Sequence, residues 1–208
     1  SHQFVNGSVK NLTIFFFFLF ENLPIFINFI KIFPNVERLC LKGALGIGDK
    51  YLFHILSTFP NLLELSIPGF SSRVEDSNFA NLSNVDARLN ALILDYIDYD
   101  VKFFGWKNIV SNLKSIEKLI IKRDYGKVSN EIVDVIIKKL KLKHLELGIG
   151  VMSEEILRKI VYDNCCNELK VLKIAKVDFD KINVNFNFNE IYKRNRLLLH
   201  LCDAEYFQ

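Results

Sequence analysis

The sequence predicts an α/β solenoid of about seven stacked units, each a short strand followed by a helix, with a curved parallel sheet on the concave side and helices on the convex side. Two observations lead to this prediction. An apolar motif recurs at a nearly constant spacing along most of the chain, and the residues between its copies carry the period of a helix. The chain has 208 residues, half of them apolar, so it is long enough to bury such a core.

Each copy of the motif has apolar residues at its first, fourth and sixth positions, as in Val36, Leu39 and Leu41. Copies begin at residues 9, 36, 62, 89, 116, 142 and 169, so successive copies are 26 or 27 residues apart. An apolar chain produces single matches by chance, but the spacing of chance matches drifts. The constant spacing therefore indicates a true internal repeat.

Strand and helix signals alternate along the chain. The end of each motif alternates as a short strand does, and the apolar residues between copies recur every three to four positions. Pro24 suits a first helical turn, and Ser129 and Ser153 are expected N-caps because acidic residues follow them. The expected helices span residues 24–33, 49–59, 102–113, 129–140, 153–164 and 188–197. The connection over residues 68–87 is rich in turn formers, so we expect a loop with a short helix there.

We interpret residues 1–208 as one domain, with a C-terminal cap over residues 177–208. Stacking is the only way in which each unit can bury its apolar face, so the motif's apolar positions are expected to form one continuous core. The residues expected in that core include Val36, Leu39, Leu41, Leu62, Leu65, Ile67, Leu119, Ile121, Leu145, Leu147 and Leu172.

The copies VERLCL, LLELSI, LNALIL, IEKLII, LKHLEL and LKVLKI resemble those of the leucine-rich-repeat family. The resemblance is to the kind with repeats of about 26 to 28 residues, found in F-box/leucine-rich-repeat proteins and ribonuclease-inhibitor-like proteins, and it covers residues 9–176. Two features depart from the family pattern. The Asn or Cys that usually follows the strand is mostly absent, and no F-box precedes the first repeat in this sequence.

The resemblance implies a non-catalytic module that holds a protein partner, with substrate recognition in an F-box-like ubiquitin-ligase adaptor as one form of that role. The alternative is a secreted effector or receptor-type leucine-rich-repeat protein that acts on a host or extracellular partner. Richness in Asn, Ile, Lys and Phe suggests AT-biased coding, as in some insects, protists and intracellular parasites, and such organisms deploy leucine-rich-repeat proteins against hosts. An F-box upstream of Ser1 would favour the adaptor, and a signal peptide would favour the effector.

Composition argues against several other classes of partner. The net charge of +3 is mild, with basic and acidic residues interleaved, so we expect no nucleic-acid partner. Residues 12–33 are interrupted by polar residues such as Glu21 and Lys31, so we expect no membrane span. The four cysteines have neither disulfide-scaffold nor zinc spacing, so we expect free thiols and a cytoplasmic, reducing compartment. The cysteines are Cys40, Cys165, Cys166 and Cys202.

No catalytic residue, cofactor or metal site is expected, and we do not interpret the chain as an enzyme. The glycine-rich stretch over residues 43–49 lacks the order of a phosphate-binding loop and sits where a repeat must turn. The four histidines fall in different units, without a Cys or carboxylate at ligand spacing. A solenoid this short also lacks the deep pocket that chemistry usually needs.

The candidate partner-binding surface lies on the concave face, where Ile93 and Ile120 are predicted to be neighbours. An apolar centre with a charged, tyrosine-containing rim suits protein binding. The alternative is that the two isoleucines are buried under a loop or the terminal segment. The expected partner-binding residues are Ile93, Ile120, Lys118, Lys122, Asp95, Tyr96, Arg38, Glu64, His144 and Glu146. We also expect at least one of the consecutive aromatics Phe15–Phe18 to be exposed, because one strand cannot turn all four inward.

Overall fold

The computed structural model describes residues 6–15, 23–42, 49–68, 88–95, 103–122, 129–148, 153–162, 168–175 and 198–202. Within these residues eight strands form one sheet, in the order of the sequence. The strands are β1 (Asn11–Phe15), β2 (Arg38–Lys42), β3 (Glu64–Pro68), β4 (Ala91–Asp95), β5 (Lys118–Lys122), β6 (His144–Leu147), β7 (Val171–Ala175) and β8 (Leu198–Cys202). The helices are α1 (Leu23–Ile30), α2 (Asp49–Thr58), α3 (Phe103–Asn112), α4 (Asn130–Lys139) and α5 (Glu154–Tyr162).

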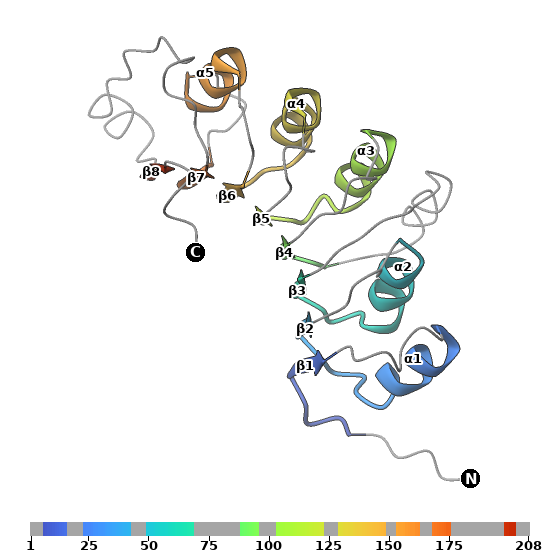
Figure 1. Cartoon of the computed structure of the whole chain (residues 1–208). Helices are drawn as coiled ribbons and strands as arrows, with labels where there is room; N and C mark the ends of the chain where they lie inside the picture. Colours follow the sequence, from blue (N-terminus) through green and yellow to red (C-terminus); the bar gives the residue numbers. More distant parts are fainter. Residues whose placement is uncertain are drawn as a thin grey trace.

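All neighbouring strands are parallel, as the repeat predicts. The described helices follow β1, β2, β4, β5 and β6, and each returns the chain to the start of the next strand. In Figure 1 the strands succeed one another along an arc, and the helices lie on its outer side. This α/β arrangement fits a repeat solenoid.

The five described helices agree with the expected ones to within a few residues. Both predicted N-caps are present: the Ser129 hydroxyl accepts a hydrogen bond from the Ile132 N–H, and the Ser153 hydroxyl accepts one from the Ile156 N–H. Each cap satisfies a backbone donor that the first helical turn leaves without a partner. The helix expected over 188–197, and residues 69–87 of the third connection, lie outside the described residues.

The motif's apolar positions form the core. All eleven residues named from the sequence are at most 1% exposed, from Val36 to Leu172. They pack in one cluster with buried helix residues such as Phe26 and Ile55. The first copy differs, because Val9 and Leu12 are only partly buried. The described residues contain no strand beyond β1 that could cover this end of the stack.

The sheet has one strand more than the seven motif copies predict. β8 pairs with β7 so that Leu172 lies opposite Leu199 and Ile174 opposite Leu201, which continues the spacing of 27 residues. The first motif position of this eighth unit would be residue 196, which is an arginine. The apolar pattern therefore fails at the eighth unit although the two strand leucines keep the register.

A ladder of backbone hydrogen bonds joins successive units just before the strands. The carbonyl of Lys10 accepts from the N–H groups of Glu37 and Arg38, at 2.8 and 3.0 Å. The same two-donor pattern recurs at the carbonyls of Glu37, Leu63, Asn90, Glu117 and Lys143. These bonds satisfy backbone N–H and C=O groups of neighbouring units. The units are therefore cross-linked through their backbones, although the Asn of the repeat pattern is mostly absent.

The apolar stretch over residues 12–33 contributes to two separate elements, β1 and the eight-residue helix α1. Among the described residues, no helix combines the length and the apolar character that a membrane crossing requires.

Candidate binding surface

The side chains that alternate with the core residues point to the sheet face opposite the helices, which we call the open face. The central row across this face is Thr13, Cys40, Ser66, Ile93, Ile120, Glu146 and Lys173. The row before it is Asn11, Arg38, Glu64, Ala91, Lys118, His144 and Val171. Neighbours in a row lie on adjacent strands, so they are the closest side chains across the sheet.

The predicted apolar pair is adjacent but not equally exposed. Ile93 lies opposite Ile120 in the register, as expected. Ile93 is half-buried, whereas Ile120 is only 7% exposed, which corrects the expectation that both face solvent. Ile120 has Ile93 and Glu146 on either side in its row and a lysine two residues away in each direction along β5. Lysine stems cover apolar surface while the ammonium stays in water, so these neighbours contribute to the burial of Ile120.

Glu146 is a buried carboxylate on the open face, 6% exposed. Three nitrogen atoms surround it: Lys122 Nζ at 3.5 Å, His144 Nε2 at 3.7 Å and Lys173 Nζ at 3.8 Å. We call these four residues the Glu146 cluster. A carboxylate removed from water is tolerated when cations offset the loss of hydration, and the two lysines from the strands on either side provide them.

His144 is the titratable member of the cluster near neutral pH. Burial lowers its pKa below the usual 6.5, and the charges of Lys118 and Lys173 lower it further, while Glu146 acts in the opposite direction. Its imidazole is therefore neutral at pH 7. The Nε2 atom is buried and, within the described part of the chain, has no hydrogen-bond partner. A neutral imidazole between two lysines leaves the positive charge of this region on the lysines alone.

Seven of the ten predicted site residues lie on three adjacent strands, and the side chains of six of them are described. These six are Ile93 on β4, Lys118, Ile120 and Lys122 on β5, and His144 and Glu146 on β6. Arg38 and Glu64 lie on β2 and β3, further along the sheet, where Arg38 donates to the Asn11 side chain at 3.3 Å. Asp95 lies opposite Lys122 in the register, but its side chain lies outside the described residues, as does Tyr96.

Lys173 is a member of this region that the predicted site omits. It lies opposite Glu146, on β7. The spacing of 27 residues between Glu146 and Lys173 is the signal that could have identified it, since one repeat length separates lateral neighbours.

Two other expectations concern single residues near the N-terminal end. Phe15 is 56% exposed, and the Lys42 ammonium lies 5.6 Å from the centre of its ring, within range of a cation–π contact. Residues 16–18 lie outside the described part of the chain.

Cys40 is a free thiol on the open face. Cys165 and Cys166 lie outside the described residues, and so does the side chain of Cys202.

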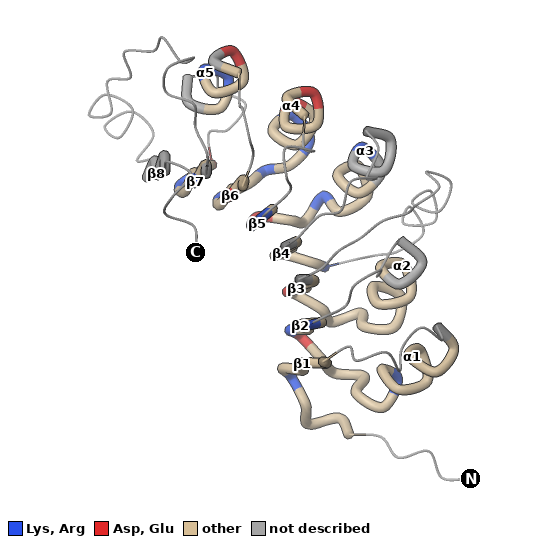
Figure 2. Tube along the Cα trace, viewed as in Figure 1, with Lys and Arg blue, Asp and Glu red and all other residues tan. Residues whose placement is uncertain are grey.

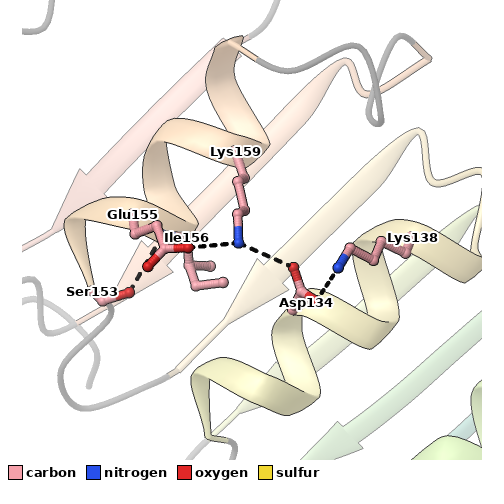
Figure 3. A network of polar contacts seen from close by, with 6 residues as sticks. All are labelled: Asp134, Lys138, Ser153, Glu155, Ile156 and Lys159. Atoms are coloured by element: carbon pink, nitrogen blue, oxygen red, sulfur yellow. Dashed lines mark hydrogen bonds and ion pairs between the residues drawn. The ribbon is translucent and has the colours of Figure 1, made fainter.

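A second polar network lies on the helix side of the sheet, between α4 and α5 (Figure 3). The Asp134 carboxylate pairs with Lys138 in its own helix and with Lys159 of α5, whose ammonium is 3.6 Å away. Lys159 also pairs with Glu155 at 2.7 Å. The Ser153 N–H donates to the side chain of Asn130 at 3.1 Å, close to the start of both helices. This network joins two neighbouring helices and is separate from the Glu146 cluster.

Charge is spread along the whole array rather than gathered at one end. Figure 2 shows lysines and arginines on strands, helices and connections from the N-terminal to the C-terminal units. The surface before the strands carries ion pairs between neighbouring units, Lys10 with Glu37 at 2.7 Å and Lys143 with Glu117 at 2.6 Å. These pairs lie before the strands, whereas the lysines of the Glu146 cluster lie on the open face.

The fold is similar to the crystal structure of a protein from Bacteroides fragilis, with a TM-score of 0.51. The two sequences are 16% identical, and the similarity covers 97% of this chain and 67% of that chain. At this level of identity the likeness shows a shared fold alone. No family model matches the chain, and no curated protein matches it.

Proposed function

We propose that the chain is a leucine-rich-repeat solenoid that acts as a non-catalytic protein-binding module, with the open face of β4 to β7 as its contact surface. The observation that supports the proposal is the composition of this face. Ile93 presents a partly exposed aliphatic side chain directly beside the lysines and the Glu146 cluster. Apolar contact supplies affinity once water is excluded, and flanking charges fix the orientation of a partner.

The repeat architecture supports the same role. A stack of parallel strands presents a continuous face on which every second side chain is available to a partner, whereas each unit buries its other side chains in the core. The open face therefore varies in sequence from unit to unit without affecting the core leucines. Its row from Ser66 to Lys173 passes from small and polar through aliphatic to charged. Such variation along one surface is what selective recognition of a protein requires.

Substrate recognition for an F-box-like ubiquitin ligase is the specific setting that the family resemblance adds to this proposal. Sequencing the full-length transcript tests that setting, because an F-box encoded upstream of Ser1 would join the repeats to a ligase. A secretory signal peptide at the start of the transcript would contradict it.

Selection from a library of displayed random peptides tests the binding function without a known partner. Peptides selected by the immobilised chain are expected to lose affinity for an Ile93→Ser variant. The expected loss is about thirtyfold if Ile93 is a central contact, which corresponds to about 2 kcal/mol. Ile25→Ser is the matched control, because Ile25 is 55% exposed and lies on α1, on the opposite side of the sheet.

The control variant should bind the selected peptides as the unmodified chain does, and thermal melts should show that both variants are folded at the temperature of the binding assay. Failure to select any peptide, or peptides that bind both variants equally, would contradict a contact surface on the open face. Loss of binding by the control alone would move the surface to the helix side.

A further inference from the structure

The open face of β5, β6 and β7 carries an excess of positive charge. Its described charged side chains are the lysines Lys118, Lys122 and Lys173 and the carboxylate Glu146. Three lysines against one glutamate leave two positive charges in excess while His144 is neutral. Asp95, by its place in the register, lies beside Lys122. Lys118 and Lys173 lie on the strands on either side of His144.

The lysines are not fully engaged by Glu146. The ammonium groups of Lys122 and Lys173 lie 3.5 and 3.8 Å from its carboxylate oxygens, beyond the length of a direct hydrogen bond. Their side chains are 43% and 38% exposed, whereas that of Glu146 is 7% exposed. The buried carboxylate thus holds the lysines in place from below, and their ammonium groups remain accessible from the open face.

An apolar side chain lies beside this charge. Ile93 is half-buried on β4, next to β5, so a partner that reaches Lys118 can also cover the exposed part of Ile93. A strand spacing of about 4.8 Å puts Ile93 and Lys173 roughly 14 Å apart, a span that one short peptide segment covers. Complementary charge at such a site suppresses wrong partners and speeds association.

We propose that the partner of this face is a protein segment with aspartate or glutamate side chains next to an apolar residue, its carboxylates paired with Lys118 and Lys173 and its apolar residue against Ile93. This inference rests on the proposed function and names the chemistry of its partner. Pairing would supply each lysine with the hydrogen-bonded carboxylate that Glu146 does not provide.

Labelled synthetic peptides test the proposal directly. Three peptides of equal length share the same leucines and differ in their other residues, which are acidic, neutral or basic. Binding is measured by fluorescence anisotropy in about 0.15 M salt, where long-range attraction is largely screened. The acidic peptide should bind, and the Lys118→Gln/Lys173→Gln variant should bind it about tenfold more weakly, as expected for the loss of two partly exposed ion pairs.

Two further variants make the test specific. Glu146→Gln should bind the acidic peptide several-fold more tightly, because it removes the carboxylate that competes for the lysines. Lys107→Gln/Lys139→Gln should bind as the unmodified chain does, because it removes the same charge from exposed lysines of α3 and α4. The glutamate variant should bind the acidic peptide more tightly and the lysine variant more weakly. Opposite changes in affinity distinguish a charge-specific contact from a general loss of folding.

The outcomes that overturn the inference are distinct from those that overturn the proposed function. Equal binding of the neutral or basic peptide, or weaker binding by Glu146→Gln with folding retained, rules out an acidic partner. A single-stranded oligonucleotide that competes as well as the acidic peptide would make the face a general polyanion site instead. If displayed peptides are selected and depend on Ile93 but show no enrichment of acidic residues, the binding function stands and only this inference fails.

Discussion

Glu146 faces Ile120 in the register of β5 and β6, yet its carboxylate lies 3.5 Å from the ammonium of Lys122, two residues further along β5. The ion pair is therefore diagonal across two strands rather than lateral. Lys173 approaches the same carboxylate from the other side, at 3.8 Å. One buried acid thus links three strands of the open face by charge, next to the isoleucine that it helps to bury.

The first prediction concerns this diagonal pair. A double-mutant cycle with Lys122→Ala and Glu146→Gln, measured by chemical denaturation, should give a favourable coupling below about 1 kcal/mol, because the lysine is partly exposed and the gap is longer than a hydrogen bond. Glu146→Gln by itself should destabilise the chain, since it leaves lysines close together without a counter-charge. A coupling near zero would contradict the prediction and would mean that Lys173 suffices to offset the charge of the carboxylate.

The second prediction separates the two isoleucines. Ile120→Asp should lower the free energy of unfolding by about 3 kcal/mol, because it places a charge where only 7% of the side chain is exposed. Ile93→Asp should cost about 1 kcal/mol or less, because the half-buried position leaves its carboxylate access to water and to Lys118. Thermal melts of the single variants distinguish the two positions. Equal losses of stability would show that the two isoleucines are equally buried.

The third prediction concerns pH. The pKa of His144 is lowered in the folded chain, so the unfolded chain binds the proton more readily. The stability that a neutral His144 contributes is present above the pKa of histidine in the unfolded chain, about 6.5. It is lost as the pH falls from there through the lower pKa of the folded chain. Relative to His144→Gln, the unmodified chain should therefore lose stability on acidification below pH 6.5. A difference that stays constant over this range would show that His144 does not titrate differently on folding.

The fourth prediction concerns the helix side. The hydrogen bond from Lys138 holds the pKa of Asp134 below its usual 3.8, and the charge of Lys159 acts in the same direction. An NMR titration of the Asp134 carboxyl carbon should show a midpoint below that value. The midpoint should rise more in Lys138→Gln than in Lys159→Gln, since Lys159 lies 3.6 Å away from the carboxylate. A larger rise in Lys159→Gln would contradict this prediction and would show that the contact between the two helices has the larger effect on the pKa of Asp134.

The periodic pattern of the sequence determined the core and the sheet. A spacing of 26 or 27 residues fixes which leucines become lateral neighbours, because only in-register stacking lets every unit bury its apolar face. Leu65 and Leu145 are accordingly fully buried, and Ile93 lies opposite Ile120 as the spacing predicts. The N-caps Ser129 and Ser153 were likewise readable, since capping depends on residues three positions apart in the chain.

Tertiary structure alone decided how much of each open-face side chain meets water. The pattern puts Ile120, Glu146 and Lys173 in one row but cannot say that two of them are buried and the third is not. Exposure depends on the directions that long side chains from neighbouring strands take, and those directions follow from contacts between residues of different units. The eighth strand, β8, is a second feature that only the tertiary structure decided. Leu199 and Leu201 keep the register although Arg196 breaks the motif, because pairing with β7 depends on the strand and not on the residue before it.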